Sequence, residues 1–224
     1  MSEKRFLITE DGSHTIFLPE LKETYHSTHG ALSESEYVFI EKGLDYAFQG
    51  GKQSIKIFEL GFGTGLNALL SWIFAEKHQV LIQYQTLEAF PLTQEDIEIL
   101  NYPRLIHDNS AAEKFLKIHQ SKWEDWIELS DYFQLNKIEN RIQDLQVDYR
   151  VDVCFFDAFA PSKQPEMWEI PILEKIKEML VKNGILVTYC AKGQLKRDLK
   201  SLGFEVESLP GPPGKMEMVR ATKC

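Results

Sequence analysis

The stretch Glu59-Leu60-Gly61-Phe62-Gly63-Thr64-Gly65-Leu66-Asn67 decides the fold, because it joins the end of a strand, a glycine-rich turn and the start of a helix. Residues 55–60 are mostly apolar, as in a strand that is buried in a parallel sheet. Apolar side chains then recur at helical spacing from Leu66 to about Lys77. These features predict the start of a βαβ unit, whose glycines let the backbone approach a ligand at the helix N-terminus.

The spacing of the glycines indicates which kind of ligand the turn holds. The dinucleotide-binding fingerprint is G-x-G-x-x-G, but Leu66 stands here at the position of its last glycine. Glu59, before the first glycine, would repel a pyrophosphate and suits an ammonium group. The pattern E-x-G-x-G-x-G is typical of Rossmann-like S-adenosylmethionine-dependent methyltransferases. A tight strand-to-helix turn without a ligand is the alternative interpretation.

The composition fits one globular core. The chain has 224 residues, of which 43% are hydrophobic. We expect a Rossmann-like α/β domain over residues 51–224, with an N-terminal extension over residues 1–50 packed on it. No run approaches the ~20 apolar residues of a membrane span, and the N-terminus leads into no signal-peptide core. Three cysteines without metal or redox spacing fit reduced thiols. We therefore expect a cytoplasmic protein without a membrane segment.

The charge is unevenly distributed along the chain. The formal net charge of −9 argues against a general nucleic-acid binder. However, residues 1–149 contain 13 Lys/Arg and 24 Asp/Glu, whereas residues 150–224 contain 12 and 10. The C-terminal third can therefore meet a polyanion locally, through a patch such as Lys192, Lys196, Arg197 and Lys200. A solvated helix face is an equal interpretation of that patch.

The N-terminal extension is predicted to form a hairpin and a helix. Arg5–Ile8 and His14–Leu18 have the pattern of two strands around the turn 10–13. The helix is expected to begin at Ser33, in a capping box with Glu36.

Two histidines in the same extension, His26 and His29, are three residues apart. This spacing invites a metal-site interpretation, but no set of Cys, Asp or Glu ligands accompanies them. We therefore expect polar loop or substrate-contact histidines, and no metal.

Acidic residues follow two strands that are predicted after the glycine turn. The strand 80–87 ends at Glu88, where Rossmann-like proteins bind ribose hydroxyls with a carboxylate; a surface glutamate is the alternative. The strand 132–138 ends at Glu139, which would lie beside an adenine edge. A helix N-cap at Asn140 is an equal interpretation of that second strand end.

The most apolar strand, 151–156, ends at Asp157. Ligands of open α/β sheets bind outside the carboxyl ends of the strands. If these strands are neighbours, Asp157 and Glu59 face the same crevice.

The remaining pattern completes a mostly parallel seven-stranded sheet. Trp123 and Trp126 lie at helical spacing, and a helix is expected over Met167–Val181, ended by Lys182-Asn183-Gly184. Three more strands are expected, at 185–189, 204–209 and 216–221. The last two form a closing β-hairpin that is typical of Rossmann-like methyltransferases.

Several motifs together resemble the MnmD family, the methyltransferase module of the bacterial tRNA-modifying enzyme MnmC. That enzyme makes 5-methylaminomethyl(-2-thio)uridine at the wobble position. The resemblance covers nearly the whole chain and rests on Tyr25-His26-Ser27, Gly30-Ala31-Leu32, Tyr37-Val38-Phe39, Gly61-Phe62-Gly63-Thr64-Gly65-Leu66-Asn67, Glu88-Ala89-Phe90-Pro91-Leu92, Asp157-Ala158-Phe159-Ala160-Pro161, Met167-Trp168 and Lys215.

The resemblance implies N-methylation of 5-aminomethyl(-2-thio)uridine in tRNA, with S-adenosylmethionine as the cofactor. Separate upstream enzymes would supply the modified uridine. Only methyl transfer is implied, because the chain reaches Cys224 without the FAD-dependent oxidoreductase domain of the bifunctional enzyme. The implied cofactor-binding residues are Glu59, Gly61, Phe62, Gly63, Gly65, Asn67, Glu88, Phe90 and Glu139. The implied substrate-binding residues are Tyr25, Phe159, Lys163 and Lys215.

The implied chemistry assigns a catalytic role to Asp157. A primary amine with a pKa near ~10.4 is mostly protonated at neutral pH and cannot attack a methyl group. Asp157 is expected to accept a hydrogen bond from the amine and to take its proton. A helix-capping role for Asp157 is the alternative.

Three other functions use similar features. An NAD-dependent oxidoreductase shares the strand, turn and helix, but Glu59 and Leu66 count against it. A small-molecule amine methyltransferase or an aminopropyltransferase would keep the fold and change the acceptor. A non-catalytic RNA-binding module is disfavoured by the acids at the strand ends.

Overall fold

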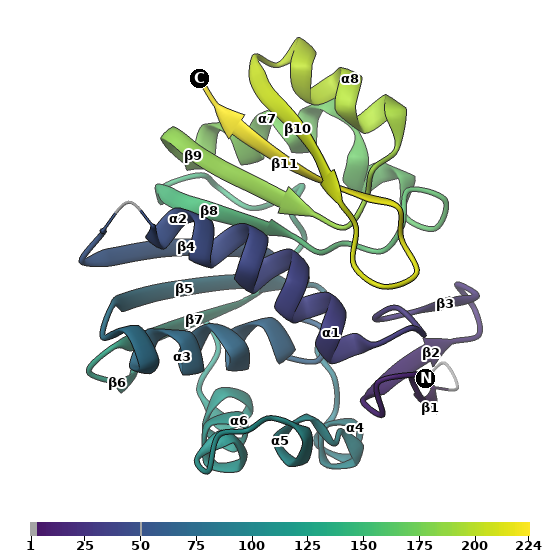
Figure 1. Ribbon diagram of the computed structural model, residues 1–224, viewed down its shortest axis with the longest axis vertical. Helices are drawn as coiled ribbons and strands as arrows, with labels where there is room; N and C mark the ends of the chain where they lie inside the picture. The colour runs from purple at the N-terminus through teal and green to yellow at the C-terminus, as the bar shows by residue number, and fades with distance from the viewer. Residues whose placement is uncertain (1–3, 50) are drawn as a thin grey trace.

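The computed structural model describes residues 4–49 and 51–224, and this part of the chain contains an eight-stranded sheet and a separate three-stranded sheet. The large sheet has the order β10-β11-β9-β8-β4-β5-β7-β6 (Figure 1). Its central strands β9, β8, β4, β5 and β7 are parallel, whereas β11 and β6 are antiparallel to their neighbours. The bounds are β4 (Ser54–Leu60), β5 (Leu81–Glu88), β6 (Trp126–Ser130), β7 (Phe133–Glu139), β8 (Val151–Phe156), β9 (Leu180–Thr188), β10 (Phe204–Pro210) and β11 (Glu217–Lys223). The predicted mostly parallel α/β fold with a C-terminal hairpin is confirmed.

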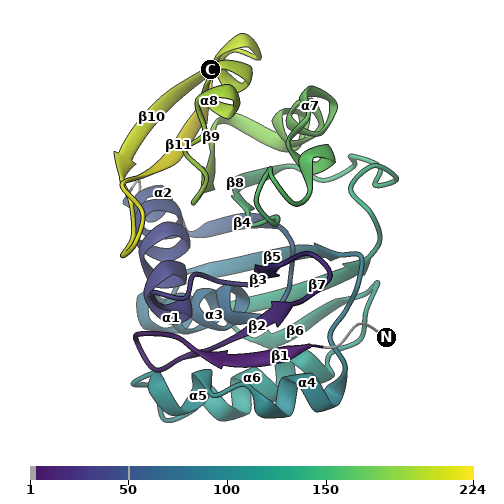
Figure 2. The ribbon, with the colours of Figure 1, turned by 90° about the vertical axis from the view of Figure 1, so that its right-hand side faces the viewer.

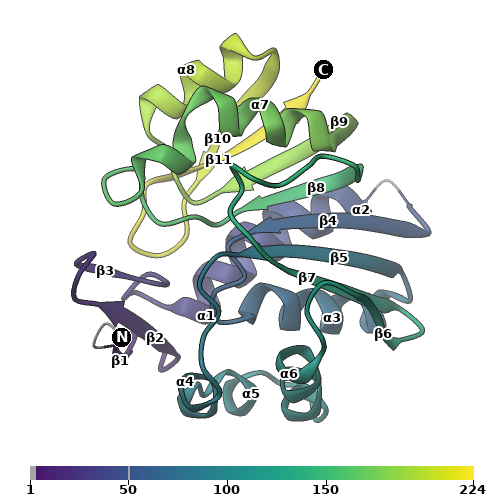
Figure 3. The same cartoon turned by 180° about the vertical axis from the view of Figure 1, so that it is seen from behind.

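Helices cover both faces of the large sheet (Figures 1 and 3). Successive residues of a strand point to opposite faces, so Ile57 belongs to one apolar core and Phe58 to the other. The first face carries α1 (Ala31–Ser35), the π-helical η1 (Glu36–Asp45), α2 (Tyr46–Phe48) and α3 (Leu66–His78). The second face carries α7 (Ile170–Met179) and α8 (Gly193–Ser201), with the short 3-10 helix η2 (Pro165–Trp168) before them.

The remaining elements surround one end of the sheet. The connection from β5 to β6 contains α4 (Gln94–Ile99), α5 (Tyr102–Leu105) and α6 (Ala111–Gln120), of which α6 packs against α3. The small sheet consists of β1 (Arg5–Ile8), β2 (His14–Leu18) and β3 (Glu23–Thr24), so the predicted hairpin is confirmed. This small sheet lies in front of the carboxyl ends of β4, β5 and β8 (Figure 2). It therefore covers the edge at which ligands of open α/β sheets bind.

The predicted start of the first helix is wrong. The helix begins at Ala31 after Gly30, and no side chain caps it. Instead of capping its own helix with Glu36, Ser33 donates its backbone N–H and its hydroxyl to Asp11 Oδ2, at 2.9 and 2.8 Å. A carboxylate from the hairpin turn thus replaces the local capping box.

One further prediction is corrected by strand pairing, and one strand is added to the expected sheet. The helix α7 ends at Met179, and Lys182-Asn183-Gly184 lies inside the long strand β9, with Asn183 at φ 63° beside a register shift. Trp126 lies in β6, opposite Asn136 of β7, and not in a helix. The sheet consequently has one strand more than expected, because pairing with β7 outweighs the helical spacing of the tryptophans.

None of the helices within residues 4–49 and 51–224 has the length and apolar character needed to cross a bilayer. The same residues contain no group of three or more His, Cys, Asp or Glu that could hold a metal ion.

Candidate functional site

The glycine turn between β4 and α3 requires residues without a side chain. Gly61, Gly63 and Gly65 have φ values of 95°, 51° and 71°, in the left-handed region that favours glycine. A Cβ atom on Gly61 would also lie 2.8 Å from the backbone carbonyl oxygen of Asp157. The turn therefore packs directly against the backbone that follows β8.

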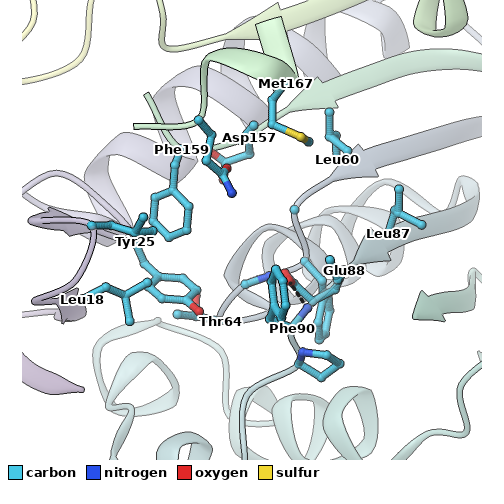
Figure 4. A pocket seen from close by; sticks show the side chains of 18 of the residues that line it. Leu18, Tyr25, Leu60, Thr64, Leu87, Glu88, Phe90, Asp157, Phe159 and Met167 are labelled. Carbon is cyan, nitrogen blue, oxygen red and sulfur yellow. Dashed lines mark hydrogen bonds between the residues drawn. The ribbon is translucent and has the colours of Figure 1, made fainter. Parts of the chain in front are cut away.

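A cavity of about 1080 Å³ opens between this turn, the N-terminal sheet and the segment after β8. Figure 4 shows Tyr25, Phe159 and Asp157 on one side of the cavity and Glu88 and Phe90 on the other. Most of the predicted site residues line it, namely Tyr25, Gly61, Phe62, Gly63, Asn67, Glu88, Phe90, Glu139, Asp157 and Phe159. Glu59, Gly65, Lys163 and Lys215 do not.

Glu88 connects the glycine turn to the loop after β5. One carboxylate oxygen accepts a hydrogen bond from Gly63 N and the other from Phe90 N, both at 2.9 Å. Because each carboxylate oxygen has two lone pairs, both oxygens can accept one more hydrogen bond. Glu88 can thus accept two adjacent hydroxyl groups while it holds the turn.

Glu59 lies beneath the cavity and is completely buried. It accepts hydrogen bonds from Thr86 Oγ1 at 2.8 Å and from Asn67 Nδ2 at 3.0 Å. Burial raises the pKa of the Glu59 carboxyl to about 8, and the nearby charge of Asp157 adds to this shift. Asn67 lines the cavity, so the nearest contact of Glu59 with a ligand passes through Asn67.

Asp157 is half-buried at the end of β8 and faces the cavity. Its Oδ2 accepts a hydrogen bond from Asn67 Nδ2 at 3.0 Å. Burial raises the pKa of Asp157 to about 7, with a smaller contribution from the negative charge of Glu34. A carboxyl with this pKa can exchange a proton near neutral pH.

Two aromatic rings form a wall next to Asp157. The rings of Tyr25 and Phe159 meet edge to face, with centroids 5.2 Å apart. Trp168 Nε1 donates to the backbone oxygen of Phe159 at 2.8 Å and so fixes the segment. A Cβ atom on Gly63 would lie 3.2 Å from the Tyr25 ring, so Tyr25 also touches the glycine turn. This wall provides aromatic, apolar surface within the cavity.

Two further aromatic residues lie on the other side of the turn. Phe62 is 5% exposed and packs against His119 and Trp123, whereas Phe90 is 66% exposed. The guanidinium group of Arg141 lies 5.9 Å from the Phe90 ring centroid. With the exposed Glu139 nearby in the lining, these residues offer apolar surface and one acceptor group to a planar ligand.

The two predicted lysines lie outside the cavity. Lys215 forms an ion pair with Glu34 and lies 4.2 Å from the centroid of the Tyr189 ring. It lines a second, more open hollow of about 560 Å³ together with Tyr189 and Met216. Lys163 lines neither hollow.

The cavity is predominantly acidic. Its described lining contains six acidic side chains against two basic ones: Glu20, Glu88, Asp96, Glu139, Asp157 and Glu166 against Lys4 and Arg141. Lys4 is paired with Asp96. The lining therefore suits a positively charged ligand.

Sequence reasoning assigned no site role to several lining residues, among them Gln164, Met167 and Arg141. His26, for which the sequence left open a loop position or a substrate contact, lines the cavity directly after Tyr25. Arg141 follows the strand end at Glu139. Proximity to predicted residues was the signal for Arg141 and Gln164, whereas Met167 also belongs to the Met167-Trp168 motif.

Comparisons with known proteins agree with this geometry. A family model described as S-adenosyl-L-methionine-dependent methyltransferase matches residues 112–224. The chain is 30% identical, over 95% of its length, to the tRNA 5-methylaminomethyl-2-thiouridine biosynthesis bifunctional protein MnmC of Leptospira interrogans, and covers 34% of that protein. It is 28% identical to the protein of the same name in Pseudomonas fluorescens, over 88% of the chain and 32% of the relative. The chain thus spans about a third of the length of these curated relatives.

One solved structure is similar over nearly the entire chain. The crystal structure of MNMC2 from Aquifex aeolicus superposes with a TM-score of 0.80 at 27% sequence identity. The match covers 99% of this chain and 70% of the other. The large sheet and the N-terminal extension therefore both have counterparts in a known protein.

Proposed function

We propose that this chain, which belongs to the family of S-adenosyl-L-methionine-dependent methyltransferases, methylates the primary amine of 5-aminomethyl(-2-thio)uridine at the wobble position of tRNA. The name of the curated relatives contains the nucleoside that this reaction would form. The likeness to MNMC2 extends over the N-terminal wall of the cavity as well as the cofactor half. Separate upstream enzymes would install the aminomethyl group, and a tRNA substrate would place the reaction in the cytoplasm.

The residues of the cavity fit S-adenosylmethionine. The cofactor carries a sulfonium and an ammonium group, and the lining is predominantly acidic. Glu88 has free lone pairs for the two ribose hydroxyls, while it keeps Gly63 in place. Phe62, Phe90 and Glu139 would hold the adenine.

The methionine end is assigned to the buried part of the site. The Asn67 side-chain oxygen is buried and has no hydrogen-bond partner within the described residues. It can accept a hydrogen bond from an ammonium group. Glu59 would act through Asn67, whose amide it holds, and would favour that positive charge.

The observation that carries the proposal is the position of Asp157, beside the glycine turn and next to the Tyr25–Phe159 wall. When bound, S-adenosylmethionine supplies an electrophilic methyl group that a neutral amine can take up. The acceptor amine arrives mostly as an ammonium ion. In its carboxylate form, Asp157 accepts a hydrogen bond from this group, takes one proton and leaves a lone pair free to attack. Asn67 orients the carboxylate through Oδ2.

Tyr25 and Phe159 would hold the uracil ring, so that its aminomethyl arm reaches Asp157. Orientation of this kind lowers the reaction barrier by several kcal/mol, because the entropy cost of aligning the reacting atoms is met when the substrate binds. Lys215 and Lys163 would contact RNA outside the cavity. Residues 1–50 are proposed to act as a packed extension that completes the acceptor side of the domain.

The test is nucleoside mass spectrometry of tRNA that carries 5-aminomethyluridine, after incubation with the protein and S-adenosylmethionine. We expect the aminomethyl nucleoside to gain one methyl group, and the Asp157→Asn variant to serve as the matched control. A parallel incubation with a polyamine tests small-molecule acceptors. Methyl transfer to the polyamine but not to the RNA would contradict the proposal.

A further inference from the structure

Thr64, in the middle of the glycine turn, is contacted by two histidines, one at its hydroxyl and one at its backbone oxygen. His26 of the N-terminal extension places Nε2 2.9 Å from the Thr64 hydroxyl. His119, at the end of α6, places Nε2 3.2 Å from the Thr64 backbone oxygen. These two contacts connect elements that are far apart in the sequence to the turn that faces the cavity.

Both histidines are neutral over the physiological range. Burial lowers the pKa of His26 to about 4, and burial together with the charge of Lys137 lowers the pKa of His119 to about 4. A neutral imidazole has one donor and one acceptor nitrogen. Because the Thr64 carbonyl can only accept, His119 Nε2 carries the hydrogen and donates.

His119 is itself held by its surroundings. Lys137 is 1% exposed, and its ammonium group donates to the backbone oxygens of Ile118 and His119 at 2.8 and 3.0 Å. This lysine satisfies carbonyl groups at the C-terminal end of α6, which have no partner within the helix. His119 also fills the space beside Gly65, where a Cβ atom would lie 2.9 Å from its Nε2.

The N-terminal extension contacts the turn through two consecutive residues. The Tyr25 ring lies against Gly63, and the His26 ring lies against Thr64. The same segment therefore lines the acceptor side and supports the cofactor side. A turn of three glycines has unusually large backbone freedom, so these contacts reduce the number of shapes that it can adopt before a ligand binds.

We propose that His26 and His119 are positioning residues of the cofactor site, which hold Thr64 so that the glycine turn is already in its binding shape. This inference rests on the proposed placement of S-adenosylmethionine against the turn. It assigns to the N-terminal extension a contribution to cofactor affinity in addition to its contact with the acceptor.

The test measures the dissociation constant of S-adenosylhomocysteine by calorimetry, without RNA. His26→Phe keeps an aromatic ring but removes the hydrogen bond, and we expect about tenfold weaker binding. His26→Gln can still reach Thr64 with an amide and is expected to restore most of the affinity. In a Thr64→Val background, His26→Phe should have an effect of less than about twofold, because the hydrogen bond is already absent. His14→Phe, which removes another histidine hydrogen bond of the same extension, to the Ile99 backbone oxygen, should not change binding.

Kinetic measurements on the same variants give a second readout. His26→Phe should raise KM for S-adenosylmethionine and leave KM for tRNA nearly unchanged. An unchanged dissociation constant in a folded His26→Phe protein, or fully additive effects of His26→Phe and Thr64→Val, would overturn the proposal. If His26→Phe does not fold, Thr64→Val decides, because it removes the same hydroxyl contact: unchanged binding by a folded Thr64→Val protein, with binding by Glu88→Ala weakened, would overturn the proposal. Failure of the cofactor placement itself would appear separately, as normal binding by Thr64→Val and Glu88→Ala.

Discussion

Glu59 and Asp157 accept hydrogen bonds from the same amide nitrogen, Nδ2 of Asn67, each at 3.0 Å. The pKa of each carboxyl is raised, mainly by burial, to about 8 and about 7 respectively. The two acids are therefore coupled through one neutral group, and a bound cation would favour the ionised form of both. This arrangement places a proton acceptor for the substrate next to a second acid that a bound cation would ionise.

The first prediction concerns Asp157→Asn. We expect methyl transfer to slow by ~10²-fold or more, because the amide can hydrogen-bond but cannot take a proton. The wild-type rate should rise with pH around the Asp157 pKa of about 7, as the carboxylate form accumulates. This rise should be absent from the pH profile of kcat in the variant. Near-native turnover at saturating tRNA would remove Asp157 from the catalytic role.

The second prediction concerns the stability of the cofactor-free protein. The Glu59 pKa is about 8 in the folded state against a reference of 4.5, so the folded protein retains a proton that the unfolded chain has lost between these values. The free energy of unfolding should therefore fall as pH rises from about 4.5 to 8. Glu59→Gln should make the free energy of unfolding less dependent on pH, because glutamine does not ionise. Asp157, whose pKa is also raised, would account for the pH dependence that remains. Urea unfolding at pH 5 and pH 8 measures the free energy of unfolding of the wild-type protein and the variant. An equal change between the two pH values in both proteins would contradict the burial argument.

The third prediction concerns Glu88→Ala. We expect affinity for S-adenosylhomocysteine to fall by about 1.5–3 kcal/mol, the range for losing hydrogen bonds to a charged group. The variant loses the hydrogen bond that Gly63 N donates to Glu88 as well as the proposed ribose contact. Glu98→Ala, at an exposed position of α4, is the control. Calorimetry that shows no difference between the two variants would refute the ribose assignment.

The fourth prediction concerns the basic residues that contact the tRNA phosphates. Lys192 and Arg197 are exposed, whereas Lys196 is paired with Glu217 and Lys215 with Glu34. Few phosphates are then neutralised, so log Kd against log salt should change with a slope of about 2 to 4, somewhat under one unit per phosphate. Replacing both Lys192 and Arg197 with Glu should raise KM for tRNA more than it lowers kcat.

The control for this fourth prediction is Lys182→Glu. Lys182 is exposed near the start of β9, at the opposite end of the strand from Asp157 and the cavity. A salt response close to zero, or equal effects of the control and the double reversal, would show that the face of α8 is solvated. The tRNA would then be held elsewhere, and the loop from His26 to Leu32 is the next segment to test.

The local sequence pattern was sufficient to predict the core of the fold. The apolar run before Gly61, the glycines and the helical repeat after Leu66 each follow from backbone preferences over a few residues. Strand ends at Glu88 and Asp157 could be located for the same reason. Their convergence on one cavity followed from the rule that parallel strands present their carboxyl ends at one edge.

Contacts between segments that are distant in the sequence determined the features of the site that local patterns did not predict. The burial of Glu59 behind Asn67 depends on the packing of β4 beneath α3. The pairing of Lys215 with Glu34, which keeps this lysine out of the cavity, joins the C-terminal hairpin loop to the first helix. Similarly, Ser33 donates hydrogen bonds to Asp11 and does not form the capping box that the local pattern predicted.

The sequence by itself therefore determined the βαβ start and the acids at the strand ends, because glycine geometry and apolar periodicity act over short distances. The tertiary structure alone decided which of these side chains line the cavity and which lie beneath it. His26 shows the difference: its role depends on a contact with Thr64 that no local pattern encodes. Such contacts form only when the N-terminal sheet folds over the carboxyl ends of β4, β5 and β8, and that arrangement is fixed by packing across the whole chain.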